Sequence, residues 1–319
     1  MENAVSLAQK WFDIVEEEKQ KRNIISDAHS LVENNYLIGD EWSDITTTLG
    51  SLESKETSTN PDFAALVVRL LNEAEISKGD TVGVALSGSF PALSISVLAA
   101  IQTMELDAII MSSLGASTYG ANQPDATWID IEKWLRLHGN LQYSSSVITM
   151  GAGQDHGNGL TEEGKALLKT AAVRNHRDLY IPSDIIESIE YKTQLFQENN
   201  ISILINIGGN MSSMGACSHS LNIPNGLHFS TNTCNDNDKG IIARLNENDI
   251  PFIQFLNIKE LASRYGIEVS PGIHYSKSTN LYSEVKSNKY LTTLFFFLGL
   301  ITLYIFLKDP VFSKTIHQP

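Results

Sequence analysis

The stretch TVGVALSGSFPALSISVLAAI, Thr81 to Ile101, decides the fold. Its opening residues, 81–86, are largely apolar, which is typical of a strand buried on both faces of a parallel sheet. The run stops at Ser87-Gly88-Ser89, and a helix is predicted from Pro91, because proline is favoured in the first helical turn. A buried strand that leads through small polar residues into a helix predicts an α/β protein whose helix start is directed at the strand end.

The same alternation of short apolar runs and helical segments continues along the chain. Further strands are predicted over residues 107–111, 145–150, 201–207 and 252–256, and further helices over 128–138, 161–175, 183–199 and 258–265. Alternation of this kind indicates parallel strands joined by helices that cover both faces. We therefore expect an open, mostly parallel sheet with helices on both faces, preceded by N-terminal helices and followed by a transmembrane helix.

The chain of 319 residues is long enough for one large α/β domain with additional segments. Met1 to Lys21 carries apolar residues at helical spacing among acids and lysines, which predicts an amphipathic helix rather than a signal peptide. We expect five parts, namely an N-terminal helical segment 1–50, an α/β domain 51–270, a linker 271–289, a transmembrane helix 290–307 and a short tail 308–319.

The segment YLTTLFFFLGLITLYIFL, Tyr290 to Leu307, has no charged residue and lies between Lys289 and Lys308. At a rise of 1.5 Å per residue it reaches about 27 Å, which is close to the thickness of a bilayer core. The alternative is a buried core helix. The predicted localisation is a single-pass membrane protein, and a small excess of lysine before the span favours a cytoplasmic main domain while leaving the side open.

An excess of acidic residues limits the possible partners. The net charge is −14, whereas a nucleic-acid-binding protein needs a basic face to neutralise phosphates, so no nucleic acid is expected. The two cysteines, Cys217 and Cys234, are not in a CxxC pair, so no metal site is predicted, and their pairing is left open. Neither GxGxxG nor GxxxxGK[ST] occurs, and no cofactor is expected.

Four of the predicted strands end in small, polar loops that contain glycine. In an open parallel sheet these ends share one edge, where ligands bind in a crevice. Glycine lets the backbone approach a ligand closely, and amides at a helix start favour an anion. The sequence therefore predicts a site for a carboxylate or a phosphate. The candidate ligand-binding residues are Ser87, Gly88, Ser89, Ser112, Ser113, Asn122, Asn206, Gly208, Gly209 and Asn210.

Two other interpretations of these loops stay open. The loops are ordinary tight turns if the protein is a structural scaffold without a small-molecule site. Alternatively, the protein is a serine-dependent hydrolase or transferase acting on glutamyl-type amide bonds. Ser87 or Ser89 would then attack, His156 would act as the base, and Asp155 would orient the histidine. The nucleophile-elbow pattern GxSxG does not occur.

Several long motifs, spread from about Leu37 to Gly266, resemble the poly-gamma-glutamate system protein family. This family accompanies bacterial genes for making and exporting poly-gamma-glutamate. The motifs are TSTNPDFAALVVRLL (57–71), VGVALSGSFPALSISVLAA (82–100), SSLGASTYGANQPDATWIDIE (112–132), INIGGNMSSMG (205–215) and IPFIQFLNIKELASRYGI (250–267).

The resemblance implies an accessory component of poly-gamma-glutamate synthesis or export, with other membrane proteins of that system as partners. Family members usually carry an N-terminal membrane segment, whereas the span predicted here is C-terminal. Poly-gamma-glutamate is a polycarboxylate, which a protein with a net charge of −14 repels at long range. We therefore expect the loops to hold one small anion or a short polymer end, and not a long polymer.

Overall fold

A computed structural model describes residues 1–28, 35–216, 223–231, 239–271, 277–282 and 289–308. The chain forms two compact units, Met1–Tyr282 and Ser283–Pro319. Cys217 and Cys234, whose pairing the sequence leaves open, lie outside the described residues.

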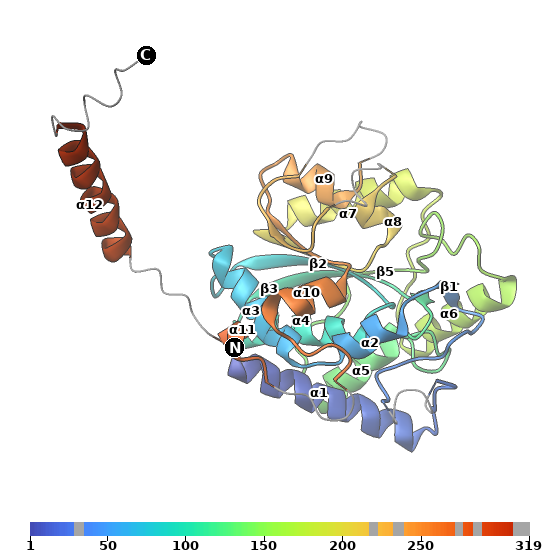
Figure 1. Ribbon diagram of the computed structural model, residues 1–319. Coiled ribbons are helices and arrows are strands. Elements are labelled where there is room, and N and C mark those ends of the chain that lie inside the picture. The colour runs from blue at the N-terminus through green and yellow to red at the C-terminus, as the bar shows by residue number, and fades with distance from the viewer. Residues whose placement is uncertain (29–34, 217–222, 232–238, 272–276, 283–288, 309–319) are drawn as a thin grey trace, which may run out of the picture. The chain divides into compact units, whose positions relative to one another are not determined.

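The first unit is built around a six-stranded sheet (Figure 1). In spatial order the strands are β5 (Val147–Thr149), β3 (Asp107–Ser113), β2 (Thr81–Ser87), β6 (Ile203–Ile207), β8 (Phe252–Phe255) and β7 (Gly226–His228). The first five run parallel, and β7 pairs with β8 in the antiparallel direction at the edge. The predicted α/β class with a mostly parallel sheet is confirmed, whereas the antiparallel strand was not predicted.

The stretch that opens at Thr81 forms the interior of this sheet. Strand β2 pairs with β3 on one side and with β6 on the other, and it is buried from Val82 to Ser87. Gly83 gives one face of the strand room for a neighbour, because a Cβ at this position would lie 2.9 Å from the ring of Phe196. A strand enclosed in this way needs apolar residues on both faces, which explains its continuous apolar run.

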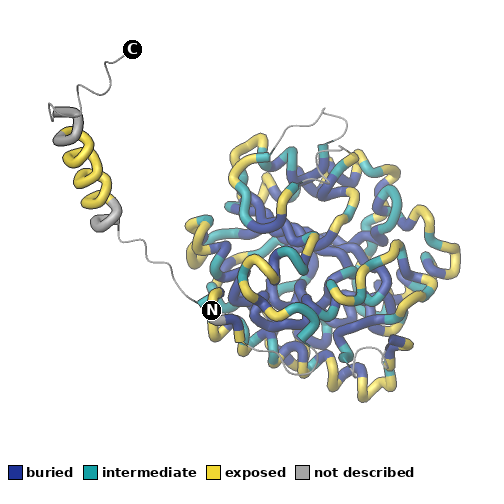
Figure 2. Tube along the Cα trace, in the orientation of Figure 1, coloured by how far each residue is buried: buried dark blue, intermediate teal, exposed yellow. Residues whose placement is uncertain are grey.

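Helices α1 (Glu2–Lys21), α3 (Asp62–Glu73), α4 (Pro91–Thr103) and α5 (Trp128–His138) lie on one side of the sheet, and α1 packs on the other three. Helix α4 lies between the sheet and α1, and its residues are buried from Pro91 to Ile101. Figure 2 shows this continuous buried interior. Trp11 of α1 is fully buried, and its indole nitrogen donates a hydrogen bond of 2.8 Å to the carbonyl oxygen of Gly139. The amphipathic helix predicted at the N-terminus therefore covers α4.

The opposite face of the sheet carries a second layer. It consists of α7 (Ile185–Glu198), α8 (Met211–Met214) and α9 (Ile241–Asn246), which pack on one another over a separate apolar cluster (Figure 1). The remaining helices of the first unit are α2 (Leu52–Ser58), α6 (Glu162–Arg174), α10 (Ile258–Tyr265) and α11 (Thr279–Tyr282). The prediction of helices on both faces is confirmed.

The predicted division at residue 50 does not separate two compact units. A short strand, β1 (Thr46–Thr48), pairs with β4 (Ala116–Ser117) in a two-stranded parallel sheet. The first 50 residues are therefore tied to the α/β domain through β4, in addition to the packing of α1 on α4. The threonine-rich segment before residue 50 gave no clear strand signal, because a three-residue strand is shorter than any pattern that periodicity resolves.

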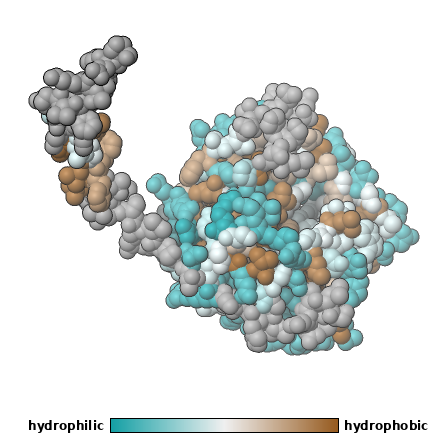
Figure 3. All heavy atoms as spheres, viewed as in Figure 1, coloured by the Kyte–Doolittle hydropathy of each residue, from teal (hydrophilic) through white to brown (hydrophobic). Residues whose placement is uncertain are grey.

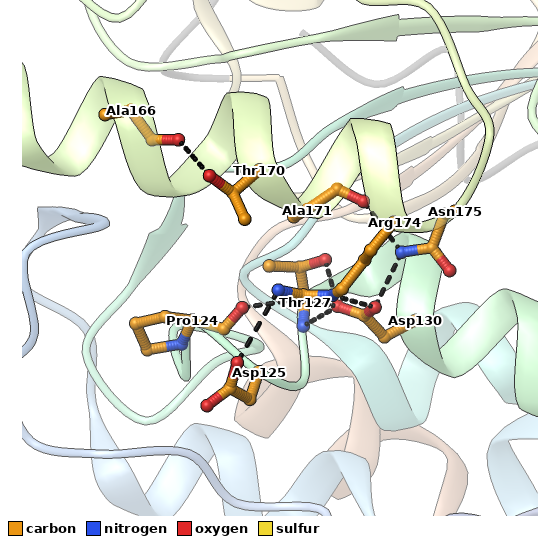
Figure 4. A network of polar contacts seen from close by, with 9 residues as sticks. All are labelled: Pro124, Asp125, Thr127, Asp130, Ala166, Thr170, Ala171, Arg174 and Asn175. Atoms are coloured by element: carbon orange, nitrogen blue, oxygen red, sulfur yellow. Dashed lines mark hydrogen bonds and ion pairs between the residues drawn. The ribbon is translucent and has the colours of Figure 1, made fainter.

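Helices α5 and α6 are fastened by a network of charged and polar contacts (Figure 4). Asp130 forms a capping box with Thr127 at the start of α5. The same carboxylate accepts hydrogen bonds from Arg174, at 2.8 Å from Nε, and from Asn175, at 2.6 Å. Asp130 raises the pKa of the Arg174 guanidinium. These contacts hold the end of the long loop that connects β4 to α5.

The second unit contains helix α12 (Lys289–Lys308), in which side chains are described for residues 293–304. Among the residues that the structure describes, none of the helices combines the length and the apolarity that crossing a bilayer requires. The membrane span predicted over 290–307 therefore stays a prediction.

Trp11 offers a test of the role of α1. We expect Trp11→Ala to lower the free energy of unfolding by about 3–5 kcal/mol, because it removes a buried aromatic side chain and a hydrogen bond. The matched control is Trp42→Ala, since the Trp42 side chain is 60% exposed, and it should change stability by no more than about 0.5 kcal/mol. Urea denaturation measures both values, and equal effects would contradict the packing described for α1.

Candidate functional site

The carboxyl ends of the five parallel strands lead into one crevice. It has a volume of about 470 Å³. Its lining includes Ser87 at the end of β2, Ser113 at the end of β3, and residues that follow β5, β6 and β8, namely Gly151, Gly209 and Leu256. The strand ends therefore meet in one hollow, which is the arrangement on which the predicted site depends.

Two glycine bends come very close to these serines. Gly208 has a φ of +87°, and a Cβ there would lie 2.7 Å from Ser87 Oγ. Gly151 has a φ of +70°, and a Cβ there would lie 2.9 Å from the Cβ of Ser113. A side chain at either position would be strained and would collide with a serine. Ser89 and Asn210, two further candidates, also line the crevice.

Gly88 and Ser112 lie beside the crevice and not in its lining. A Cβ on Gly88 would lie 2.9 Å from the carbonyl oxygen of Leu114, so this glycine permits two loops to pack. Ser112 lines a second hollow of about 10 Å³ together with Asp155 and Lys192. Its hydroxyl is buried and makes no hydrogen bond to any residue that the structure describes.

Two predicted ligand-binding residues have structural partners instead. The Asn122 side chain accepts a hydrogen bond of 2.9 Å from the Asp40 amide and donates one of 2.8 Å to the Asp40 carbonyl. The Asn206 side chain donates to the Gly208 carbonyl at 2.9 Å and to Gln254 Oε1 at 2.8 Å. Both asparagines are fully buried and neither lines the crevice. They satisfy backbone and side-chain groups of the protein, which is the usual role of a buried amide.

The expectation that backbone amides of the bends face a ligand is not met at Gly88 and Gly115. The Gly88 amide donates to the Ser113 carbonyl at 2.9 Å, and the Gly115 amide donates to the Met150 carbonyl at 2.9 Å. Because the strands run parallel and end together, carbonyl groups of neighbouring strands lie within reach of these amides. At these two bends, side-chain groups are therefore the donors left to face the crevice.

The hydroxyl groups of Ser87 and Ser89 are such donors. Ser87 Oγ accepts a hydrogen bond from the Ser89 amide at 3.3 Å, and Ser89 Oγ accepts one from the Ser117 amide at 3.0 Å. Neither hydroxyl donates to another residue within the described part of the chain. Each O–H group is therefore able to donate to a ligand in the crevice.

Lys55 is the residue of this site that the sequence did not single out. Its side chain lines the crevice although the residue is only 2% exposed. The Nζ atom donates to Ser117 Oγ at 2.7 Å and to the carbonyl oxygen of Ser89, and it lies 3.7 Å from the centre of the Phe90 ring. Among the described residues, no carboxylate forms an ion pair with Lys55.

Burial without a carboxylate changes the acidity of this lysine. It lowers the pKa of Lys55 from 10.5 to about 7, because the charged ammonium loses its water. The ring of Phe90 and two oxygen acceptors compensate only part of this loss. Below about pH 7 the crevice therefore contains a cation, and no carboxylate among the described residues pairs with it.

The two-stranded sheet formed by β1 and β4, called the β1–β4 ribbon below, leads into the helix that carries Lys55 at the crevice. Gly50, which follows β1, donates its amide to Thr118 Oγ1 at 2.7 Å, and Ser51 then caps α2 by accepting from the Ser54 amide. The sequence here shows a run of threonines, a glycine and then a serine at the start of a helix, and only the glycine and serine resemble the other strand ends. Nothing in this pattern shows that a lysine one turn later is buried.

Asp155 and Lys192 form a buried ion pair next to the crevice. The Lys192 ammonium contacts Asp155 Oδ2, which also accepts from Ser188 Oγ at 2.5 Å. The second oxygen, Oδ1, accepts from Thr149 Oγ1 at 2.8 Å. The Asp155 and Lys192 side chains are 4% and 5% exposed. The carboxylate of Asp155 is therefore already neutralised and fully hydrogen-bonded.

The structure does not form the hydrolytic triad that the sequence suggested. Asp155 is engaged by Lys192, and no hydrogen bond joins it to His156. His156 Nδ1 lies 3.0 Å from the carbonyl oxygen of Pro182, and His156 does not line the crevice. Adjacent residues in a tight bend direct their side chains apart, which a sequence cannot show. His156 is therefore not placed to act as the base for Ser87 or Ser89.

The chain matches no protein-family model, no curated protein and no solved structure. The resemblance to the poly-gamma-glutamate system family thus rests on the sequence motifs alone. Within the described part of the chain, no group of three or more histidine, cysteine, aspartate or glutamate residues is arranged to hold a metal ion.

Substitution of Asp155 tests the buried ion pair that it forms with Lys192. We expect Asp155→Asn to lower the free energy of unfolding by about 3–5 kcal/mol, because it leaves the Lys192 ammonium buried without its partner. The double variant Asp155→Asn with Lys192→Met should recover much of this loss. Glu105→Gln is the control, because it breaks an exposed pair with Lys78 and should cost no more than about 1 kcal/mol. Additive losses in the double variant would contradict the pairing.

Lys55 makes a prediction about pH. Its folded pKa of about 7 lies below the ordinary value of 10.5, so unfolding takes up a proton between these values and stability rises with pH. From pH 7 to pH 9, the wild type should gain about 2 kcal/mol relative to Lys55→Met. Urea denaturation at both pH values measures this gain. Parallel stability curves for the two proteins would show that Lys55 titrates near its ordinary value.

Proposed function

We propose that the crevice binds a small anion, a carboxylate or a phosphate group. The observation that carries this proposal is the ammonium group of Lys55, which lies in the crevice wall without a carboxylate partner among the described residues. Burying a charge is costly unless it is paired. A bound anion would supply the missing charge and would return the pKa of Lys55 toward its ordinary value.

The groups around Lys55 support the same conclusion. The hydroxyl groups of Ser87, Ser89 and Ser113 line the crevice with it, and hydroxyl groups donate well to anionic oxygens. The carboxylate of Asp155 does not oppose an anion, since Lys192 neutralises it. When Lys55 is protonated, the crevice therefore carries a positive charge that Asp155 does not offset, in a protein whose net charge is −14. A local arrangement of this kind acts at short range, where the repulsion by the whole protein is weaker.

A structural scaffold and a serine hydrolase fit these observations less well. A scaffold has no need to keep a cation buried without a counter-charge, because an apolar side chain in place of Lys55 would be more stable. The predicted hydrolase uses His156 as the base for Ser87 or Ser89, and His156 Nδ1 lies 3.0 Å from the Pro182 carbonyl oxygen instead. Binding of a small anion is thus the function that the site supports best.

We further propose, from the resemblance, that the protein is an accessory component of poly-gamma-glutamate synthesis or export. The motifs that carry the resemblance include the strand ends at Ser87, Ser113 and Gly209 that line the crevice. In this role the protein would act beside other membrane proteins of the system. Unchanged polymer production after deletion of the gene would contradict it.

A membrane anchor at the C-terminus completes the proposal. The segment Tyr290 to Leu307 has no charged residue, and the described part of α12 is hydrophobic in Figure 3. Its apolar side chains are exposed, and those of Phe295 and Phe296 are 65% and 63% exposed. An exposed apolar helix of this kind needs a partner, and a lipid bilayer is the one that an uncharged segment bounded by lysines suits best.

Calorimetric titration tests the anion site. We expect acetate, phosphate, glutamate or a short γ-glutamyl peptide to bind, and Lys55→Met to weaken the binding at least tenfold, because the charge-assisted contact is lost. The control is Lys169→Met, which removes the same charge from an exposed position and should leave binding unchanged. Equal affinities in the Lys55→Met variant and the wild type would exclude the proposed site.

Fractionation of cells tests the anchor. We expect the full chain to stay with membranes after an alkaline carbonate wash. Phe297→Lys combined with Leu300→Lys should move it to the soluble fraction, because charges in a bilayer core are costly. The control variant carries Leu137→Lys and Val173→Lys, which change exposed apolar residues of the first unit, and it should remain with membranes. A wild-type protein that is fully soluble would contradict the anchor.

A further inference from the structure

The crevice has a second kind of surface beside its hydroxyl groups and its lysine. Four large apolar residues line it, namely Leu49, Phe90, Met211 and Leu256. Two of them are open to solvent, since Leu49 is 80% exposed and Met211 is 40% exposed. An apolar rim around a charged group is not needed for binding an inorganic ion, which is recognised by donors and charge alone.

These apolar residues come from separate loops that meet at the crevice. Leu49 follows β1, Met211 begins α8, and Leu256 follows β8. Leu256 lies against the β6 bend, where a Cβ on Gly209 would be 3.2 Å from Leu256 Cδ1. Phe90 joins the two kinds of surface, because its ring lies 3.7 Å from the Lys55 ammonium. At Phe90, apolar surface thus adjoins the position where an anion would bind.

The size of the crevice also exceeds what a single ion needs. Its volume of about 470 Å³ lies within the range of about 300–1,000 Å³ that is usual for pockets that hold organic ligands. An inorganic phosphate seated against Lys55 would leave most of this volume to water and would leave Leu49 and Met211 exposed.

We propose that the ligand of this crevice is an organic anion whose carboxylate or phosphate group is joined directly to an apolar chain or ring. The anionic group contacts Lys55 and the serine hydroxyls, and the apolar body covers Leu49, Met211 and Leu256. This inference rests on the proposed anion site and specifies the class of ligand that the site takes.

A long poly-gamma-glutamate chain does not fit this class of ligand. Each unit of that polymer carries a carboxylate, so a chain lying across the rim would place charges against Leu49 and Met211. Removing a charge from water without pairing it is costly. The crevice therefore favours a small amphiphilic molecule, for which each buried methylene increases affinity about fourfold.

A chain-length series tests this inference on the full-length protein. Acetate, butyrate and hexanoate, together with phosphate and butyl phosphate, are titrated by calorimetry. We expect affinity to rise about fourfold per methylene until the chain passes the rim, with a negative heat-capacity change that grows along the series. The tighter of the two head-group series identifies whether the site takes a carboxylate or a phosphate ester.

Variants of Leu49 and Met211, the exposed apolar residues of the crevice rim, test whether these residues cause the gain in affinity with chain length. Leu49→Ser combined with Met211→Gln should remove most of the gain from acetate to hexanoate, and the quantity compared is the ratio of the two affinities within each variant. Leu49→Met keeps an apolar rim and should retain the gain. Leu137→Ser, at a position 65% exposed elsewhere on the first unit, is the matched control. Both rim positions are exposed, and thermal melting checks that the variants remain folded.

The outcomes distinguish this inference from the proposed function. Equal affinity along the series, with binding that still depends on Lys55, would overturn the amphiphilic ligand and leave the anion site standing. A rise in affinity that the rim variants do not reduce would also overturn it. Failure of every anion to bind would overturn the proposed function itself.

Discussion

A buried ammonium group with no carboxylate partner among the described residues is the feature on which the proposed anion site depends. Lys55 keeps its Nζ atom against Ser117 Oγ, the Ser89 carbonyl and the Phe90 ring. These contacts compensate part of the lost hydration, and burial still lowers the pKa of Lys55 to about 7. A strongly perturbed ionisable group in a crevice is a mark of a functional site, because stability alone would not retain it.

The fold explains why this lysine lies where it does. The central position of β2 between β3 and β6 brings several strand ends to one edge. The β1–β4 ribbon then adds a wall that an open parallel sheet lacks, and α2 delivers Lys55 from that wall. Asp155 is the acidic residue among those that line the crevice, but its carboxylate forms an ion pair with Lys192 and not with Lys55. The two lysines thus have different roles. Lys192 forms an ion pair with Asp155, whereas Lys55 has no carboxylate partner among the described residues.

Elements with strong local signals could be predicted from the sequence. Helix α5 has its capping box, and β2 has an apolar run bounded by glycine and serine. The short strands β1 and β7 could not, since their three residues are defined by pairing with distant segments. For the site, the sequence placed Ser87, Ser89 and Ser113 together, because parallel strands end at one edge. It missed Lys55, because the burial of a charged side chain follows from tertiary packing alone.

NMR of Lys55 tests most directly whether its pKa is lowered and whether an anion raises it again. In protein labelled at lysine side chains, and with Lys55→Met to assign the signal, the ε-methylene resonance of Lys55 is titrated with pH. We expect a pKa of about 7 for Lys55 in the free protein, and a value at least one unit higher when phosphate or a carboxylate is present in excess. Titration near 10.5, or a pKa that no anion changes, would contradict this expectation.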